Sequence, residues 1–118
     1  MAEVTIYHNP RCSTSRGALG ALDEAGVEHD VVQYLKEPLG RDSLVALLAI
    51  LEDAPSALVR RDPRFTELGL TASDVETADQ VADVLAAHPE LMQRPVLVRG
   101  DRAIIGRPAD RVRALIAD

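Results

Sequence analysis

The stretch YHNPRCSTSR, residues 7–16, contains the only cysteine of the chain, Cys12. An alternating apolar segment precedes this stretch and a segment with helical spacing follows it, which places Cys12 in the loop before a helix. A buried structural thiol would be expected inside an apolar run. A thiol in a polar turn is instead placed where it can act as a nucleophile.

Three influences are expected to lower the pKa of the Cys12 thiol. The N-terminus of the following helix presents unpaired N–H groups and the positive end of the helix dipole. Arg16 comes one turn later on the same face, and His8 is close in the chain. Because the thiolate is the nucleophilic form, this placement favours a reactive cysteine over an incidental one in a loop.

The neighbours of Cys12 exclude a dithiol centre and argue against a phosphatase-type loop. A dithiol redox centre needs a second cysteine three residues on, but that position is Ser15. A phosphate-binding loop of the phosphatase type needs a longer segment between cysteine and arginine than residues 13–15 provide. The remaining interpretation is a lone thiolate at a helix N-terminus, a place that also attracts anions. A thiol from outside the chain must then regenerate it.

Composition restricts the class of protein further. The chain has 118 residues, which fits one domain, with 47% hydrophobic but only 3% aromatic residues. A single cysteine cannot form an internal disulfide, which fits a reducing cytosol. We find no signal-peptide pattern and no apolar run near the roughly 20 residues of a membrane span. We therefore expect a soluble, cytoplasmic protein without a membrane partner, and the net charge of −6 argues against nucleic-acid binding.

The first third of the chain predicts a β-α-β unit. Residues 3–7 alternate as a strand, and Asn9-Pro10 ends it. Any of the hydroxyl residues 13–15 can cap a helix that ends at Gly26. Residues 29–34 then predict a second strand, and the crossover helix implies that the two strands are parallel.

The middle third predicts helices. Residues 41–51 carry an apolar face, and Pro55 suits the first turn of a short helix that runs to Arg60-Arg61. Thr77 and Gln80 form a capping-box pattern for another helix, which His88-Pro89 ends.

The last third returns to sheet structure. Residues 95–99 and 102–105 flank Gly100-Asp101, as in a hairpin with a type II′ turn, and Pro108 opens a final helix. The whole pattern predicts an α/β domain over residues 1–118, with two parallel strands, a C-terminal antiparallel hairpin and a helical insert at about 38–92. This element order is that of the thioredoxin fold with helices inserted in its middle.

The sequence resembles the glutaredoxin-coupled arsenate reductases (the ArsC family). The signature lies in residues 7–10, Cys12 and residues 14–16, and further landmarks follow over nearly the whole chain. These landmarks are Tyr34-Leu35, Pro38, residues 41–44, residues 58–60, residues 67–70, His88-Pro89, Arg94-Pro95 and residues 106–108. Arg11 and Ser13 depart from the pattern, because small residues commonly flank the cysteine.

The resemblance implies a set of site residues. Cys12 and His8 would be the catalytic residues, Cys12 as the nucleophile and His8 as the histidine that precedes it, while Ser15 and Arg16 support the thiolate. Three arginines would bind the arsenate oxyanion: Arg60, Arg94 and Arg107. The sequence does not decide whether Arg60 or the adjacent Arg61 points into the site. The resemblance also implies a cis peptide bond at Arg94-Pro95.

The implied activity is reduction of arsenate to arsenite through a cysteine–arsenate intermediate. Glutathione and glutaredoxin would be external reductants, glutaredoxin as a transient partner, and no bound cofactor or metal is expected. Two alternatives of the same fold remain open. One is a redox-sensing regulator, although such relatives commonly carry a second cysteine at the position of Ser15. The other is a thiol-transfer enzyme without arsenate activity.

Overall fold

The computed structural model describes residues 2–117 and divides the chain into two compact units. The sheet unit comprises Met1–Glu37 and Arg94–Asp118, and the helical unit comprises Pro38–Gln93. The insert expected at about residues 38–92 falls in the helical unit. The interpretation of the whole chain as one domain stays a prediction, and each unit is described by itself.

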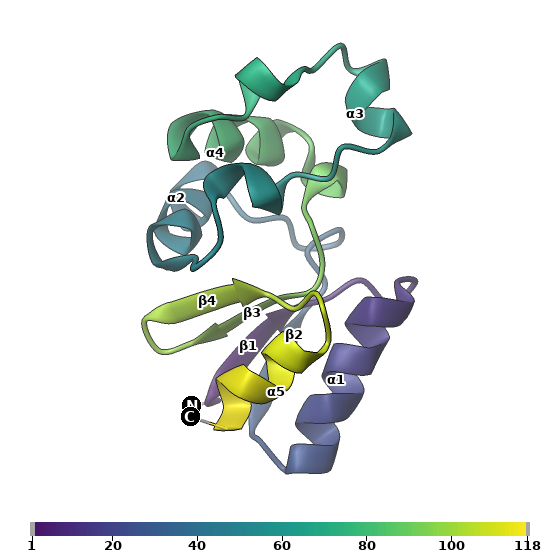
Figure 1. Ribbon diagram of the computed structural model, residues 1–118, viewed down its shortest axis with the longest axis vertical. Helices are drawn as coiled ribbons and strands as arrows, with labels where there is room; N and C mark the ends of the chain where they lie inside the picture. The colour runs from purple at the N-terminus through teal and green to yellow at the C-terminus, as the bar shows by residue number, and fades with distance from the viewer. Residues whose placement is uncertain (1, 118) are drawn as a thin grey trace. The chain divides into compact units, whose positions relative to one another are not determined.

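The sheet unit begins with the predicted β-α-β arrangement (Figure 1). Strand β1 (Val4–Tyr7) is followed by helix α1 (Ser13–Ala25) and strand β2 (His29–Val32), and the two strands pair in parallel. Gly26 ends α1 in the left-handed conformation, with φ of 68°, and its N–H bonds to carbonyl groups of the last turn. β2 is two residues shorter than the expected strand over 29–34.

A C-terminal hairpin completes a four-stranded mixed sheet. Strands β3 (Val96–Arg99) and β4 (Arg102–Ile105) are antiparallel, and β3 also pairs antiparallel with β1, which gives the order β2-β1-β3-β4. Gly100 has φ of 62°, while no described residue other than glycine has positive φ. This combination fits the predicted two-residue II′ turn, because that turn needs positive φ at its first position only.

One face of the sheet packs against two helices, α1 and α5 (Asp110–Ala117), which lie on the same side of it (Figure 1). The core between them is aliphatic, as a chain poor in aromatic residues requires, and consists of Val4, Ile6, Ala18, Leu22, Leu97, Ile104, Val112 and Leu115. Ile6, Leu97 and Ile104 are direct cross-strand neighbours. α5 begins at Asp110, two residues later than the expected start at Pro108.

The helical unit is built mainly from α2 (Arg41–Ile50) and α4 (Ala78–Ala87), which lie side by side. The predicted capping box of α4 is present: the Gln80 N–H donates to Thr77 Oγ1 and the Gln80 side chain accepts from the Thr77 N–H. The shorter helices are η1 (Pro55–Leu58), α3 (Pro63–Glu67), η2 (Ala72–Asp74) and η3 (Pro89–Leu91).

Two short elements of the helical unit differ from expectation. η1 ends at Leu58, before Arg60-Arg61, because the chain there becomes extended and forms a bridge between Val59 and Met92. α3 follows directly and was not expected. Its N-cap is Asp62, whose carboxylate accepts a hydrogen bond from the Phe65 N–H at 3.2 Å.

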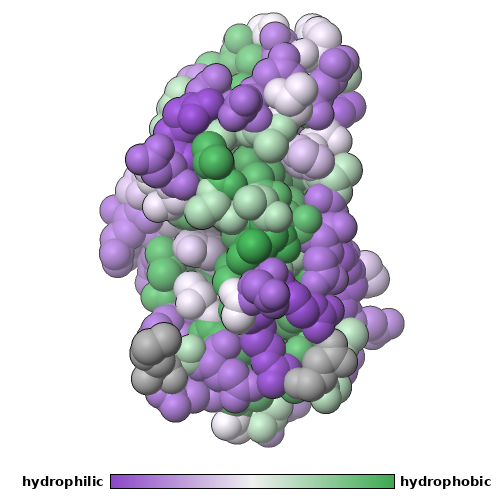
Figure 2. All heavy atoms as spheres, turned by 90° about the vertical axis from the view of Figure 1, so that its left-hand side faces the viewer, coloured by the Kyte–Doolittle hydropathy of each residue, from purple (hydrophilic) through white to green (hydrophobic). Residues whose placement is uncertain are grey.

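The surface is mixed in character. The face drawn in Figure 2 carries hydrophilic side chains over much of its area and hydrophobic ones in smaller areas. The large hydrophobic residues that stand out as exposed are Val31, Leu35 and Val45. Within residues 2–117, we find no helix with the length and apolar character needed to cross a membrane.

Candidate active site

Cys12 is itself the N-cap of α1. Its backbone is extended, its N–H donates to the Asn9 carbonyl at 3.0 Å, and its carbonyl accepts from the Arg16 N–H at 2.9 Å. The expectation that one of the hydroxyl residues 13–15 caps the helix is therefore wrong, because the tight turn begun at Asn9 leaves the cap position to Cys12. Cys12 is 8% exposed, and the backbone N–H groups of Thr14 and Ser15 in the first turn of the helix donate to its sulfur.

A polar cluster of His8, Asn9 and Ser15 holds this loop through hydrogen bonds. Ser15 is fully buried, and its hydroxyl accepts a hydrogen bond from the Asn9 N–H at 3.1 Å. The same hydroxyl lies 2.7 Å from Nδ1 of His8, which is 5% exposed. Ser15 thus joins the end of β1 to the start of α1, and the loop between them carries Cys12.

Arg107 reaches the cysteine sulfur from the far end of the hairpin. Its Nη2 donates to Cys12 Sγ at 3.3 Å, and its Nε donates to the Arg94 carbonyl at 2.7 Å. Arg94 and Arg107 each precede a proline in a cis peptide bond. The expected cis bond at Arg94-Pro95 is confirmed, and the second, at Arg107-Pro108, was not anticipated.

The pKa of the Cys12 thiol is lowered from 9.0 to about 7. Burial by itself raises this pKa, because it penalises the charged thiolate. A hydrogen bond from the Arg94 side chain, the backbone N–H groups of Ser15 and Thr14, and the positive charge of Arg94 together outweigh that penalty. The first turn of α1 and a cation next to the sulfur thus favour the nucleophilic form.

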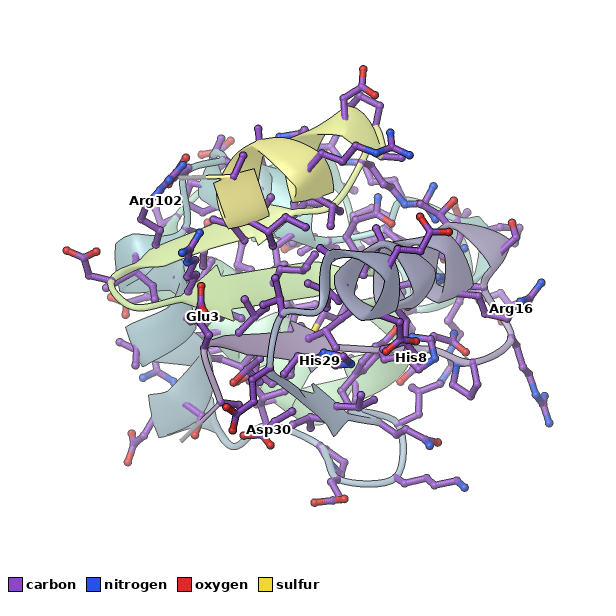
Figure 3. The ribbon with its side chains drawn as sticks, turned by 90° about the horizontal axis from the view of Figure 1, so that it is seen from below. Glu3, His8, Arg16, His29, Asp30 and Arg102 are labelled. Atoms are coloured by element: carbon purple, nitrogen blue, oxygen red, sulfur yellow. The ribbon has the colours of Figure 1, made fainter. Side chains whose placement is uncertain are left out.

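Arg16 and His8 act differently from the sequence-based expectation, in which both assist the thiolate. The Arg16 side chain lies on the outside of α1 (Figure 3), where its Nη1 donates to the Pro10 carbonyl at 2.9 Å. Burial lowers the pKa of His8, and the charge of Arg16 lowers it further. His8 is therefore neutral at pH 7 and supplies no positive charge. The cations at the sulfur are Arg94, which lowers the pKa of the thiol, and Arg107, which donates to the sulfur at 3.3 Å.

Arg60 belongs to the helical unit and was predicted to bind the oxyanion. Its N–H donates to the Leu91 carbonyl at 2.7 Å, and its Nη1 lies 3.0 Å from Asp62 Oδ2. Both partners of this ion pair are partly buried, whereas the neighbouring Arg61 is exposed. Of the two arginines, Arg60 is the one held in place by the local structure.

Two residues that organise the site lie within the family landmarks of the sequence, but no role in the site was predicted for them. Asn9 accepts from Cys12, donates to Ser15, and accepts from the Arg11 N–H at 3.0 Å through its side chain. The Asn-Pro pair that directly follows a strand is the sequence feature that could have indicated this role of Asn9. Gly106 packs so tightly that a Cβ there would lie 2.9 Å from both Leu97 Cδ1 and Pro95 Cγ. It directly precedes Arg107.

Among residues 2–117, no group of three or more histidine, cysteine or carboxylate side chains is arranged to hold a metal ion.

The fold and the site together define a thioredoxin-like α/β protein with one reactive cysteine at a helix N-terminus and arginines at its sulfur. The model of the ArsC family matches residues 7–115, and the chain belongs to that family. This bears out the family resemblance found in the sequence.

Individual relatives are similar over the full length. An arsenate reductase of Escherichia coli is 39% identical over 119 residues, which cover 100% of this chain and 84% of the relative. One from Neisseria meningitidis is 36% identical over 98% of this chain and 100% of its own length. The structure of an arsenate reductase from Vibrio cholerae superimposes with a TM-score of 0.85 at 33% identity, over 96% of this chain and 97% of that one.

Proposed function

We propose that this protein is an arsenate reductase that converts arsenate to arsenite with an external thiol as reductant. The observation that carries the proposal is the Arg107–Cys12 contact of 3.3 Å next to a thiol whose pKa is about 7. A thiolate with arginine donors at its sulfur is suited to attack the central atom of an oxyanion. Membership of the ArsC family and the activity named for the relatives support the choice of arsenate.

In the first step, the Cys12 thiolate attacks arsenic(V). A sulfur–arsenic bond forms, and one arsenate hydroxyl group takes up a proton and leaves as water. Arg94 and Arg107 neutralise charge on the remaining oxygens, which is the preorganised electrostatic role of an oxyanion site. Guanidinium groups suit this role, because their planar array of donors matches two oxygens at once.

In the second step, an external thiol attacks the Cys12 sulfur. The sulfur–arsenic bond breaks and arsenic keeps the bonding pair, so arsenic(V) becomes arsenic(III) and leaves as arsenite. The two sulfurs are oxidised to a mixed disulfide, which a further thiol reduces, returning Cys12. We propose glutathione as the first thiol and glutaredoxin as the partner that clears the mixed disulfide, which places the reaction in the reducing cytoplasm.

Arg60 and His8 complete the proposed site. Arg60 is assigned as a third arginine for the oxyanion, with Asp62 fixing its side chain through the 3.0 Å ion pair. His8 is assigned to the support of the cysteine loop, because its Nδ1 lies 2.7 Å from the buried Ser15 hydroxyl. A neutral imidazole can accept or donate there without adding charge.

The proposal is tested by arsenate-dependent NADPH oxidation with glutathione, glutaredoxin and glutathione reductase, together with direct measurement of arsenite. We expect turnover by the native protein and none by Cys12→Ser, with the fold of the variant checked by circular dichroism. Arsenite formation at the rate without protein would contradict the proposal. A redox-sensing or thiol-transfer role, in which Cys12 reacts with disulfides alone, would then account better for the lowered pKa.

A further inference from the structure

A hollow of about 200 Å³ lies on the sheet unit next to the loop that carries Cys12. One wall is formed by residues 8–11, which lead directly into Cys12 and include His8, labelled in Figure 3. The other wall is formed by Gln33, Leu35 and Lys36, from the turn that follows β2. The mechanism described above leaves this hollow unused.

The charges around the hollow are all positive. Its two charged side chains are Arg11 and Lys36, and no carboxylate lines it. Lys36 is the only lysine of a chain with a net charge of −6. In residues 2–117 neither cation forms an ion pair with an acidic side chain. Two unpaired cations beside one hollow create a local preference for an anion.

Both cationic residues lie in turns whose backbone is held by hydrogen bonds. The Arg11 N–H is held by the Asn9 side chain at 3.0 Å, in the turn that also positions Cys12. The Lys36 N–H donates to the Gln33 carbonyl at 2.9 Å. Leu35, which also lines the hollow, is 48% exposed and offers an apolar contact. The hollow therefore combines two cations, the two amide residues Asn9 and Gln33, and an apolar surface.

The volume limits what can occupy the hollow. It is below the roughly 300–1,000 Å³ of pockets that enclose a complete small-molecule ligand. It suits a single amino-acid-sized group with a carboxylate, which Arg11 can bind through its planar fork and Lys36 through its charge. Because Arg11 directly precedes Cys12, a short peptide anchored here, about 10 Å long when extended over three residues, has the length to bring its sulfur toward the cysteine.

We propose that this hollow binds a carboxylate end of the reducing thiol, an acidic peptide thiol of the glutathione type, through Arg11 and Lys36. The proposal rests on the proposed function, in which an external thiol attacks the Cys12 sulfur. In this proposal arsenate is held by the arginines at the cysteine sulfur, while the thiol is held in the hollow lined by residues 8–11 and the turn after β2. Different residues of the chain would then bind the two substrates.

A binding experiment tests the hollow independently of arsenate chemistry. Cys12→Ser protein is titrated by calorimetry with S-methylglutathione, which cannot react. We expect saturable binding that weakens about tenfold with Arg11→Gln or Lys36→Gln, as for loss of one charge-assisted hydrogen bond. Arg113→Gln removes the same charge from an exposed position and is the matched control. Equal affinity for all of these proteins, or no binding, would overturn the proposal.

A kinetic experiment then links the hollow to turnover. The native enzyme should use glutathione with a kcat/KM about tenfold or more above that for glutathione diethyl ester, whose carboxylates are masked. In the double variant Arg11→Gln/Lys36→Gln, the ratio of the kcat/KM for glutathione to that for the diethyl ester should fall toward one. An unchanged preference, or a loss seen only in the KM for glutaredoxin, would overturn the proposal in favour of a protein-docking surface. If S-methylglutathione binds as expected but no arsenite forms, the proposed function fails and the thiol site stands.

Discussion

Arg107 Nη2 lies 3.3 Å from Cys12 Sγ, although 95 residues of sequence separate the two. A second hydrogen bond, from Arg107 Nε to the Arg94 carbonyl, fixes the guanidinium group at the sulfur. The hairpin thus brings its two proline-preceding arginines to the helix N-terminus that carries the thiol. The residues that set the pKa of the thiol are thus among those to which we assign binding of the oxyanion.

The first prediction concerns the titration of Cys12. Alkylation by iodoacetamide should follow a single ionisation with a midpoint at about pH 7, because Arg94 and the first turn of α1 stabilise the thiolate. Arg94→Gln should move the midpoint toward the ordinary pKa of 9.0. Arg16→Gln is the comparison, because Arg16 bonds to the Pro10 carbonyl and should leave the midpoint near that of the native protein. A native midpoint at 9 would refute this account.

The second prediction is the effect of the same ionisation on stability. The folded-state pKa of about 7 lies below 9.0, so folding favours the thiolate. This contribution is fully present above pH 9 and is lost as the pH falls through 7. The difference in unfolding free energy between native protein and Cys12→Ser should therefore grow in favour of the native protein as pH rises from 7 to 9. Denaturant titrations at several pH values measure it, and a constant difference would contradict the prediction.

The third prediction concerns the arginines of the proposed oxyanion site. Arg107→Ala should lower kcat/KM for arsenate by about ten- to a hundredfold, as expected for the loss of charge-assisted hydrogen bonds of about 1.5–3 kcal/mol. Arg107→Lys should recover only part of the loss, because it keeps the charge without the planar fork. Arg60→Ala should show a similar loss.

The adjacent pair Arg60 and Arg61 provides an internal control for that prediction. Arg61 is exposed, whereas Arg60 is held by Asp62, so Arg61→Ala should leave arsenate kinetics close to native. If Arg61→Ala were the damaging substitution, the assignment within the pair would have to be reversed. Native kinetics for all of the arginine variants would instead contradict the assignment of these arginines to an oxyanion site.

Local patterns in the sequence predicted most of the fold, whereas the assignment of the site residues came from the family resemblance and stays a prediction. The β-α-β unit, the Gly26 helix end, the capping box of Thr77 and the Gly100 turn each depend on neighbouring residues, which a sequence displays. The N-cap at Cys12 and the turn of Arg16 toward Pro10 depend on backbone geometry at Asn9, which residue types alone do not fix. The bond from Arg107 to the Arg94 carbonyl needs the folded hairpin and has no local signal.

The fourth prediction concerns the buried hydroxyl beneath the cysteine loop. Ser15→Ala should lower the free energy of unfolding by about 1–3 kcal/mol, because it leaves the Asn9 N–H without its acceptor and His8 without its partner. Ser13→Ala is a matched control, since Ser13 is exposed one residue after Cys12. Urea denaturation measures both. Equal stability of the two variants would mean that the His8–Ser15–Asn9 cluster does not support the loop.

The fifth prediction uses two glycines with opposite surroundings. At Gly106 a Cβ would lie 2.9 Å from Leu97 Cδ1 and Pro95 Cγ and 3.0 Å from Val112 Cγ2. These atoms belong to the packed core, so Gly106→Ala should destabilise the protein by about 1–3 kcal/mol. The displaced chain also carries Arg107, so kcat/KM for arsenate should fall as well.

At Gly17, inside α1, a Cβ would meet no heavy atom within 4 Å. Gly17→Ala should therefore stabilise the protein by about 0.5–1 kcal/mol through the higher helix propensity of alanine. Thermal unfolding of the two variants should move in opposite directions from the native protein. A Gly106→Ala protein with native stability and native arsenate kinetics would show that the tight packing before Arg107 does not position the arginine at the thiol.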